Sequence, residues 1–141
     1  MKIEKIMSDS ITCIDIDDRL AVVRELFIKH KFHHLMVTNS SGELVGVISE
    51  RDYLKATNYN LELPTASDKD LAMLNKRVHQ VISKKLVAIQ QFTPFGKAIR
   101  TFHDEGVSCL PVVNSKNKPI GIITWRDIVK WLYTKTNNDK V

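Results

Sequence analysis

The sequence has little of what marks a membrane, disulfide-rich or disordered protein. Its apolar runs, such as Leu35-Met36-Val37, stay far below the roughly 18 residues that a membrane-spanning helix requires. The two cysteines, Cys13 and Cys109, form no C-x-x-C pair and have apolar neighbours, so we expect no disulfide framework and a reducing, cytoplasmic location. No apolar segment follows the opening Met1–Lys5, so we expect no signal peptide.

The chain has the length and composition of a folded protein. It has 141 residues, of which 43% are hydrophobic and 26% charged, which suits one compact domain or two small ones that share a core. The formal net charge is +5, but the basic residues are interspersed with acidic ones and no basic run exceeds Lys84-Lys85. This balance fits a solvated surface or an affinity for anions such as nucleotide phosphates or a nucleic-acid backbone, and charge alone does not choose between them.

The sequence contains one unit twice, at an offset of 75 residues. The offset aligns Leu35–Ser40 with Leu110–Ser115 and Val45–Asp52 with Ile120–Asp127, without a gap. Between Ile6 and Lys55, 12 of 50 aligned pairs are identical, and 11 of the other pairs join two apolar residues. Each half is therefore expected to depend on the other for burial.

Each unit has the pattern β-α-β-β-α. At the first helix of the second unit, Thr93 suits the N-cap and Pro94 the first helical position. At the first helix of the first unit, Asp17 or Asp18 suits the N-cap. Polar turn residues separate the two later strands of each unit. The predicted elements are strands at Thr12–Ile16 and Val87–Ile89, strands at Leu35–Thr38 and Leu44–Ile48 with their repeats, and short helices from Arg51 and Arg126.

The predicted domain boundaries follow from the repeat. Residues 1–57 form the first repeat and residues 78–133 the second. Residues 58–77 form a linker that contains a helix capped by Ser67-x-x-Asp70. Residues 134–141 are polar and are expected to form a flexible tail.

The segment Gly46-Val47-Ile48-Ser49-x-x-Asp52 is matched by Gly121-Ile122-Ile123-Thr124-x-x-Asp127. A hydroxyl residue three positions before an acid is typical of a capping box where a strand leads into a helix. The same place also suits a ligand, because helix N-terminal N–H groups bind phosphate and a carboxylate can accept hydrogen bonds from both ribose hydroxyls. Both interpretations remain open.

These two segments resemble the CBS (cystathionine β-synthase) domain family, and so does Gly106–Val113, in which a glycine precedes a hydrophobic Pro-Val strand. In that family two domains pair as a Bateman module. The openings Ile6-Met7-Ser8 and Val81-Ile82-Ser83 resemble the start of each domain, and the resemblance covers about residues 5–132. It implies an α/β (α+β) fold of two CBS repeats related by a pseudo-two-fold axis and packed sheet to sheet.

The resemblance also implies a regulatory module that binds an adenosine compound, AMP, ADP, ATP or S-adenosylmethionine, in the cleft between the repeats. The motif carboxylate would hold the ribose, the hydroxyl residue would approach the phosphate, and the strand that opens the same repeat would hold the adenine. By position the candidate residues are Asp127, Thr124, Lys85, Leu86, Val87, Ser108 and Pro111 for one site, and Asp52, Ser49, Ser10, Ile11, Thr12 and His34 for the other. The first repeat has Met36 and Lys31 where the second has Pro111 and Gly106, so we expect the Asp127 site to be the better formed.

Other chemistries have weaker support. His30, His33 and His34 lie close in sequence, but neighbours on a strand point to opposite faces, so no metal site is expected. Cys109 lacks a partner base, which favours a buried thiol over a nucleophile. One of the three histidines could instead contact a ligand phosphate. Trp125 could cover a ligand or form a dimer contact.

Two functions from different classes therefore remain. The first is the regulatory binding module, which requires no cofactor beyond its ligand and reports to an unknown protein target. The alternative is a dimerising scaffold with the same fold and no ligand. No reader motif supports nucleic-acid binding, and no catalytic set supports an enzyme. We expect a homodimer, because one monomer is not expected to bury all the apolar residues of the short helices, namely Tyr53, Leu54, Ile128, Val129, Trp131 and Leu132.

Overall fold

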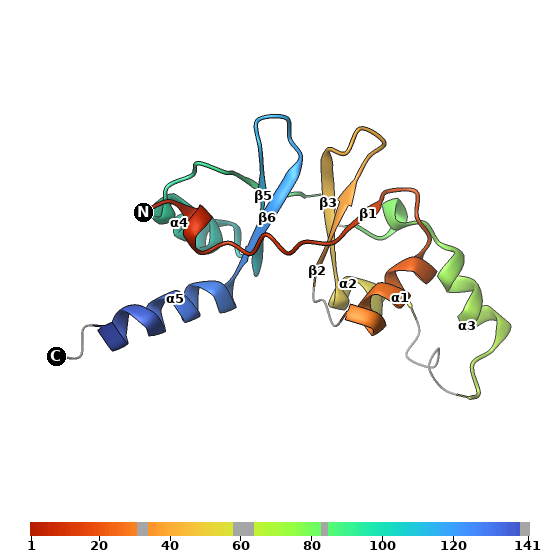
Figure 1. The fold of residues 1–141 in the computed structure, drawn as a ribbon. Helices are drawn as coiled ribbons and strands as arrows, with labels where there is room; N and C mark the ends of the chain where they lie inside the picture. The colour runs from red at the N-terminus through yellow and green to blue at the C-terminus, as the bar shows by residue number, and fades with distance from the viewer. Residues whose placement is uncertain (31–33, 58–63, 83–84, 139–141) are drawn as a thin grey trace. The chain divides into compact units, whose positions relative to one another are not determined.

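The computed structural model describes residues 1–30, 34–57, 64–82 and 85–138. They form two compact units, each with its own three-stranded sheet and helices (Figure 1). One unit comprises Met1–Ile11 and Val87–Val141, and the other comprises Thr12–Leu86. None of the described helices is both long enough and apolar enough to cross a membrane.

The unit of residues 12–86 carries the sheet of the first repeat. Its strands are β1 (Cys13–Asp15), β2 (His34–Thr38) and β3 (Leu44–Ser49), with β1 parallel and β3 antiparallel to the central β2. Its helices are α1 (Leu20–His30), α2 (Glu50–Ala56) and α3 (Asp68–Ala72), followed by the 3-10 turns η3 (Met73–Asn75) and η4 (Val78–Gln80).

The unit that contains the second repeat has the same topology. Its sheet consists of β4 (Ile89–Gln90), β5 (Cys109–Val113) and β6 (Pro119–Thr124), in the same order and with the same parallel and antiparallel pairing. Its helices are α4 (Phe95–Glu105) and α5 (Trp125–Asn138), preceded in the chain by the 3-10 turn η1 (Ile3–Lys5). The repeat in the sequence therefore corresponds to a repeat in the fold.

Each unit has its own apolar core. One face of the first sheet packs Ile14, Leu35 and Ile48 against Leu20 and Val23 of α1. The second unit repeats this arrangement, with the fully buried Phe102 of α4 at its centre; its core residues are Ile3, Ile89, Ala98, Phe102, Leu110, Val112, Ile123 and Ile128. At about 1.5–3 kcal/mol for each large apolar side chain buried, this packing is the main stabilising contribution.

The opening segment of each repeat packs in the unit that carries the sheet of the other repeat. Ile3 belongs to the core of the second sheet, and Val78, its partner at the 75-residue offset, belongs to the core of the first. The carbonyl of Met1 accepts a hydrogen bond from Phe95 N at the start of α4 (3.0 Å), and that of Lys76 accepts one from Leu20 N at the start of α1 (2.9 Å). The two repeats thus exchange their opening segments in the same way.

This exchange explains why the expected helix caps are wrong. The N-cap of α4 is Pro94, not Thr93; proline has no side-chain acceptor, and the Met1 carbonyl instead accepts from the first helical N–H. Asp18 does not cap α1 either: its carboxylate accepts from Asp15 N, and Lys76 serves the helix start. At the other end of the chain, α5 continues to Asn138, so residues 134–138 are helical where the composition indicated a tail.

Candidate functional site

The carboxylate of Asp127 lies at the first turn of α5, where β6 ends. Its Oδ2 accepts hydrogen bonds from Thr124 N (2.8 Å) and from the Thr124 hydroxyl (3.1 Å), while the Asp127 N–H donates to that hydroxyl (3.4 Å). Asp127 is half-buried, and its Oδ1 accepts no hydrogen bond from any other described residue. One oxygen therefore holds the helix start, and the other can accept from a ligand.

The first repeat places Asp52 in the same way at the start of α2. Its Oδ2 accepts from Ser49 N, and its N–H donates to Ser49 Oγ, both at 3.0 Å. The same box occurs a third time at Ser67 and Asp70, at the start of α3, which lies outside the repeated motif. The box is thus a general helix start in this chain and does not by itself indicate a ligand.

Strand register brings further candidate residues to the same sheet edges. His34 pairs with Ser49 across β2 and β3, and Cys109 pairs with Thr124 across β5 and β6. The Thr12 carbonyl, just before β1, accepts from Met36 N at 3.0 Å. In each unit, therefore, a hydroxyl residue and a carboxylate lie at the end of the sheet where the central strand begins.

The candidate residues are divided between the two units, and Ser10 and Ile11, which the sequence assigned to the Asp52 site, belong to the unit that holds Asp127. Pro111 is buried within β5 opposite Ile122, and Ser108, before β5, is exposed. Lys85 and Leu86, which the sequence assigned to the Asp127 site, belong to the other unit. One unit holds Asp127, Thr124, Val87, Ser108 and Pro111; the other holds Asp52, Ser49, Thr12, His34 and Lys85.

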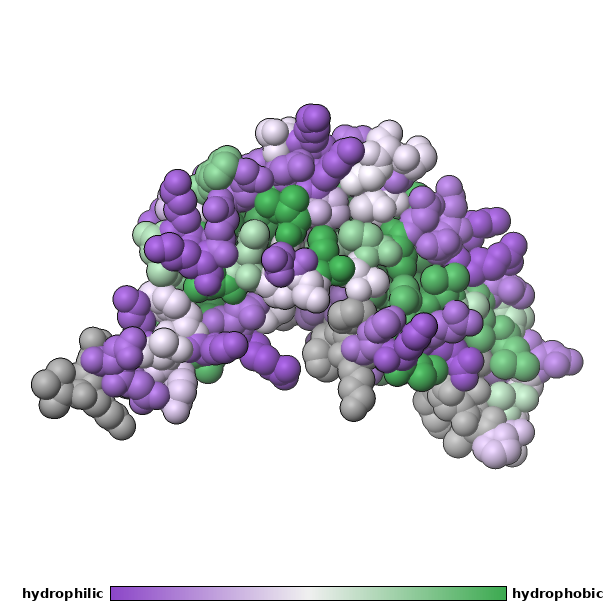
Figure 2. Space-filling model, in the orientation of Figure 1, coloured by the Kyte–Doolittle hydropathy of each residue, from purple (hydrophilic) through white to green (hydrophobic). Residues whose placement is uncertain are grey.

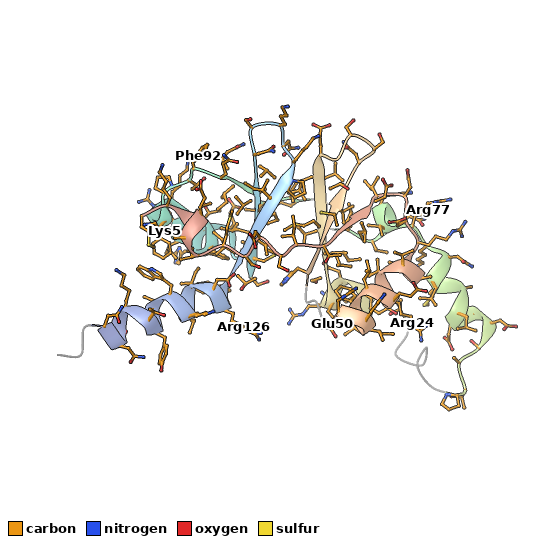
Figure 3. The ribbon with its side chains drawn as sticks, in the orientation of Figure 1. Lys5, Arg24, Glu50, Arg77, Phe92 and Arg126 are labelled. Atoms are coloured by element: carbon orange, nitrogen blue, oxygen red, sulfur yellow. The ribbon has the colours of Figure 1, made fainter. Side chains whose placement is uncertain are left out.

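A pocket of about 530 Å³ opens beside Asp127. Lys130, Trp131 and Thr134 of α5 line it together with Asp127, and residues 5–8 of the exchanged opening segment form the rest of its wall. Figure 3 shows Lys5 on η1 and Arg126 at the first turn of α5. Neither Lys5 nor Lys130 is among the candidate residues predicted from the sequence. The exchange that brings Lys5 to α5 has no local signal, whereas the i, i+3 spacing of Asp127 and Lys130 on one helix is a signal that could have found Lys130.

The motif glycines lie where the exchanged segments cross the sheets. A Cβ on Gly121 would lie 2.7 Å from Met7 Sδ and 3.0 Å from the Ser8 carbonyl oxygen, and one on Gly46 would lie 2.9 Å from Ile82 Cδ1. Ser8 and Ile122 exchange two backbone hydrogen bonds of 2.9 Å at this crossing. The glycine of the motif therefore allows the opening segment to lie close enough to form the pocket wall.

Ser108 and Trp125 line a separate pocket of about 330 Å³, together with Phe102, His103, Gly106 and Val107. Trp125 is half-exposed, and its ring lies 5.3 Å from the buried ring of Phe102. Gly106 ends α4 in the left-handed conformation (φ 62°), which glycine adopts without strain. Ser108 and Asp127 therefore face different hollows of this unit.

The described cysteines and histidines do not form a metal-binding group. Cys109 is half-buried at the start of β5, not in the core, and Cys13 is exposed, yet partial burial raises the pKa of its thiol above the ordinary value. Lys31 and His33 lie outside the described residues. Among the described residues, no three His, Cys, Asp or Glu side chains gather as metal ligands would.

The comparisons with known proteins agree with this architecture. The CBS domain family matches residues 3–59 and 78–134. A CBS domain-containing protein of Dictyostelium discoideum is 29% identical over 131 residues, which cover 92% of this chain and 90% of that protein. Some other curated relatives are longer: the chain spans 42% of a protein of Methanocaldococcus jannaschii and 23% of one of Methanosarcina acetivorans.

Solved structures show the same fold. The CBS domain pair of protein MJ0100, in complex with 5′-methylthioadenosine and S-adenosyl-L-methionine, has a TM-score of 0.74 and 21% identity, covering 94% of this chain and 99% of that one. CBSX2 in complex with AMP has a TM-score of 0.75 and 21% identity, covering 96% and 98%. On the two family matches and this shared fold, the chain belongs to the CBS domain family and carries two copies of the domain.

Proposed function

We propose that this chain is a regulatory module that binds an adenosine compound and has no catalytic activity of its own. The observation that carries the proposal is the pocket beside Asp127, in which the carboxylate keeps Oδ1 available at the start of a 14-residue helix. The pocket volume of about 530 Å³ lies within the range of small-molecule sites, roughly 300–1,000 Å³.

The chemistry of this pocket suits a ribose and an anionic group. Asp127 Oδ1 can accept from ribose hydroxyls while Oδ2 keeps its bonds to Thr124. The positive end of α5 and the ammonium groups of Lys5 and Lys130 favour a negatively charged ligand group. The ligands bound by MJ0100 and CBSX2 support the same ligand class for this chain.

The second candidate function is a scaffold that uses the same fold without a ligand. The observation that favours it is the third capping box, Ser67–Asp70, which shows that the motif carboxylates have a structural role that requires no ligand. Under this hypothesis Asp127 only starts α5, and the pocket beside it holds water.

A thermal-shift screen with AMP, ADP, ATP, S-adenosylmethionine and NAD separates the two functions. A ligand present at 100 times its dissociation constant adds about 2.7 kcal/mol to the free energy of unfolding, enough to raise the melting temperature by several degrees. Guanosine and cytidine monophosphates are the controls for adenine. If no adenosine compound shifts the melting temperature at millimolar concentration, the scaffold function takes first place.

A further inference from the structure

The charged residues in the Asp127 pocket are two lysines and one aspartate. Lys5 comes from the exchanged opening segment and Lys130 from α5, and the other lining residues are uncharged. Neither ammonium group forms an ion pair or a hydrogen bond with any other described residue. Figure 2 shows hydrophilic side chains along the visible face of α5. Two cations without partners therefore line one small space.

The negative charge of Asp127 is already partly neutralised. Its Oδ2 accepts two hydrogen bonds from Thr124, and the carboxylate lies at the positive end of α5. If Oδ1 accepts from a ribose, both lysines remain to be matched by the rest of the ligand. We infer that this pocket selects adenosine compounds with a 5′-phosphate over neutral or cationic ones, and that Lys5 and Lys130 determine the selection.

This inference rests on the proposed function and adds its ligand specificity. A 5′-phosphate carries a charge between −1.5 and −2 near neutral pH, which two ammonium groups can balance. S-adenosylmethionine instead brings a sulfonium, an ammonium and one carboxylate, a net charge of about +1, into a pocket that already holds two cations. Like charges at this range repel one another, so the same lysines that favour AMP disfavour S-adenosylmethionine.

The first repeat provides an internal comparison. At the 75-residue offset, Lys130 corresponds to Lys55, but Lys5 corresponds to Gln80 and Trp131 to Ala56. The crossing of the exchanged segment is the same in both units, since Gly46 meets Ile82 as Gly121 meets Met7. The two repeats therefore share this crossing, and Lys5 has no basic counterpart in the first repeat, so we assign the phosphate preference to the Asp127 side.

Titration calorimetry with adenosine, AMP and S-adenosylmethionine tests this specificity. The variants are Lys5→Gln, which installs the residue of the other repeat, and Lys130→Gln; the control is Lys116→Gln in the β5–β6 turn, which removes the same charge away from the pocket. The wild-type protein should bind AMP at least tenfold more tightly than adenosine, and S-adenosylmethionine least tightly. Each pocket variant should reduce the AMP-to-adenosine affinity ratio about fivefold, or about 1 kcal/mol, and the control should leave it unchanged.

The failure of this inference is distinguishable from failure of the proposed function. If adenosine and AMP bind equally, if S-adenosylmethionine binds most tightly, or if Lys116→Gln lowers the ratio as much as the pocket variants do, the specificity is wrong while adenosine binding stands. If none of the three compounds binds, the proposed function itself is wrong. A fall in AMP affinity, but not adenosine affinity, as salt rises from 50 to about 300 mM would support the two-lysine site further.

Discussion

At the scale of single residues, the chain contains its own control for the role of the motif aspartate. Asp127, Asp52 and Asp70 each accept a hydrogen bond through Oδ2 from the backbone N of the residue three positions earlier, at 2.8 to 3.0 Å. Asp127 also lines the pocket that contains Lys5 and Lys130. A loss that is common to all three alanine variants therefore measures capping, and a loss specific to Asp127 measures ligand binding.

We predict that Asp127→Ala weakens nucleotide binding at least tenfold, because a hydrogen bond to a charged group contributes roughly 1.5–3 kcal/mol. Its cost in unfolding free energy should be about 1 kcal/mol, the usual value of a lost cap. Asp52→Ala should weaken binding less, and Asp70→Ala should cost the same stability with no change in affinity. Melting temperature and calorimetric affinity of the three variants provide the check. Equal affinity in Asp127→Ala and the parent chain would remove Asp127 from the site.

Residue types alone predict part of this candidate site. The aspartates and their hydroxyl partners were predictable, because the S/T-x-x-D spacing has a local meaning that survives in the fold. Lys5 was not predictable, because it reaches the pocket through a segment whose place depends on distant packing. Thr93 was predicted as a cap, but the Met1 carbonyl takes that role.

At the scale of elements, the exchanged opening segment links the core to the pocket. Ile3 is buried in the core of the second sheet, residues 5–8 form the pocket wall, and Ser8 pairs with Ile122 of β6. Gly121 allows this approach. A substitution that displaces this segment should therefore lower both the free energy of unfolding and the ligand affinity, even though Thr124 and Asp127 themselves are unchanged.

We predict that Gly121→Ala destabilises the protein by about 1–3 kcal/mol, the range for overpacking, because the new Cβ meets the Ser8 backbone as well as Met7. Hydrogen exchange of the Ser8 and Ile122 amides should accelerate, and nucleotide affinity should fall. Gly96→Ala on α4 is the matched control: its Cβ meets nothing within 4 Å, so stability should hold or rise. Unchanged amide exchange in Gly121→Ala would contradict the role of this crossing.

The element types followed from the sequence more closely than their packing partners. Alternating burial of Leu44, Gly46 and Ile48 marks β3, and Asn39 and Asn114 set the hairpin turns by accepting from backbone N–H groups two and four residues later. Local patterns of this kind do not report which sheet an opening segment joins. Ile3 and Val78 are both apolar, so their residue types do not indicate which of the two cores each one joins. The placement of each in the core of the other repeat's sheet therefore depends on the packing of the whole fold.

At the scale of the whole molecule, the structure reduces the apolar set that suggested a dimer. Tyr53 and Ile128 are buried in the cores of their own units, and the Trp131 ring stacks on Phe95 at 4.6 Å. The exposed members are Leu54 on α2 and Val129 and Leu132 on α5. Together with Trp125 and Tyr133, the two α5 residues have the i, i+4, i+7, i+8 spacing of a single helix face.

We predict that the chain is a homodimer in which this face of α5 is covered, and that Leu132→Glu or Val129→Glu produces monomers. Both side chains are at least half exposed in the single chain, so a charge there leaves the core intact but is costly in an apolar interface. Lys116→Glu is the control for an added negative charge. Light scattering at micromolar concentration should give the mass of two chains for the parent and the control, and of one chain for the two α5 variants, with melting temperatures that show all four proteins folded. A parent chain with the mass of one copy would contradict the dimer, and α5 variants that remain dimeric would place its interface elsewhere.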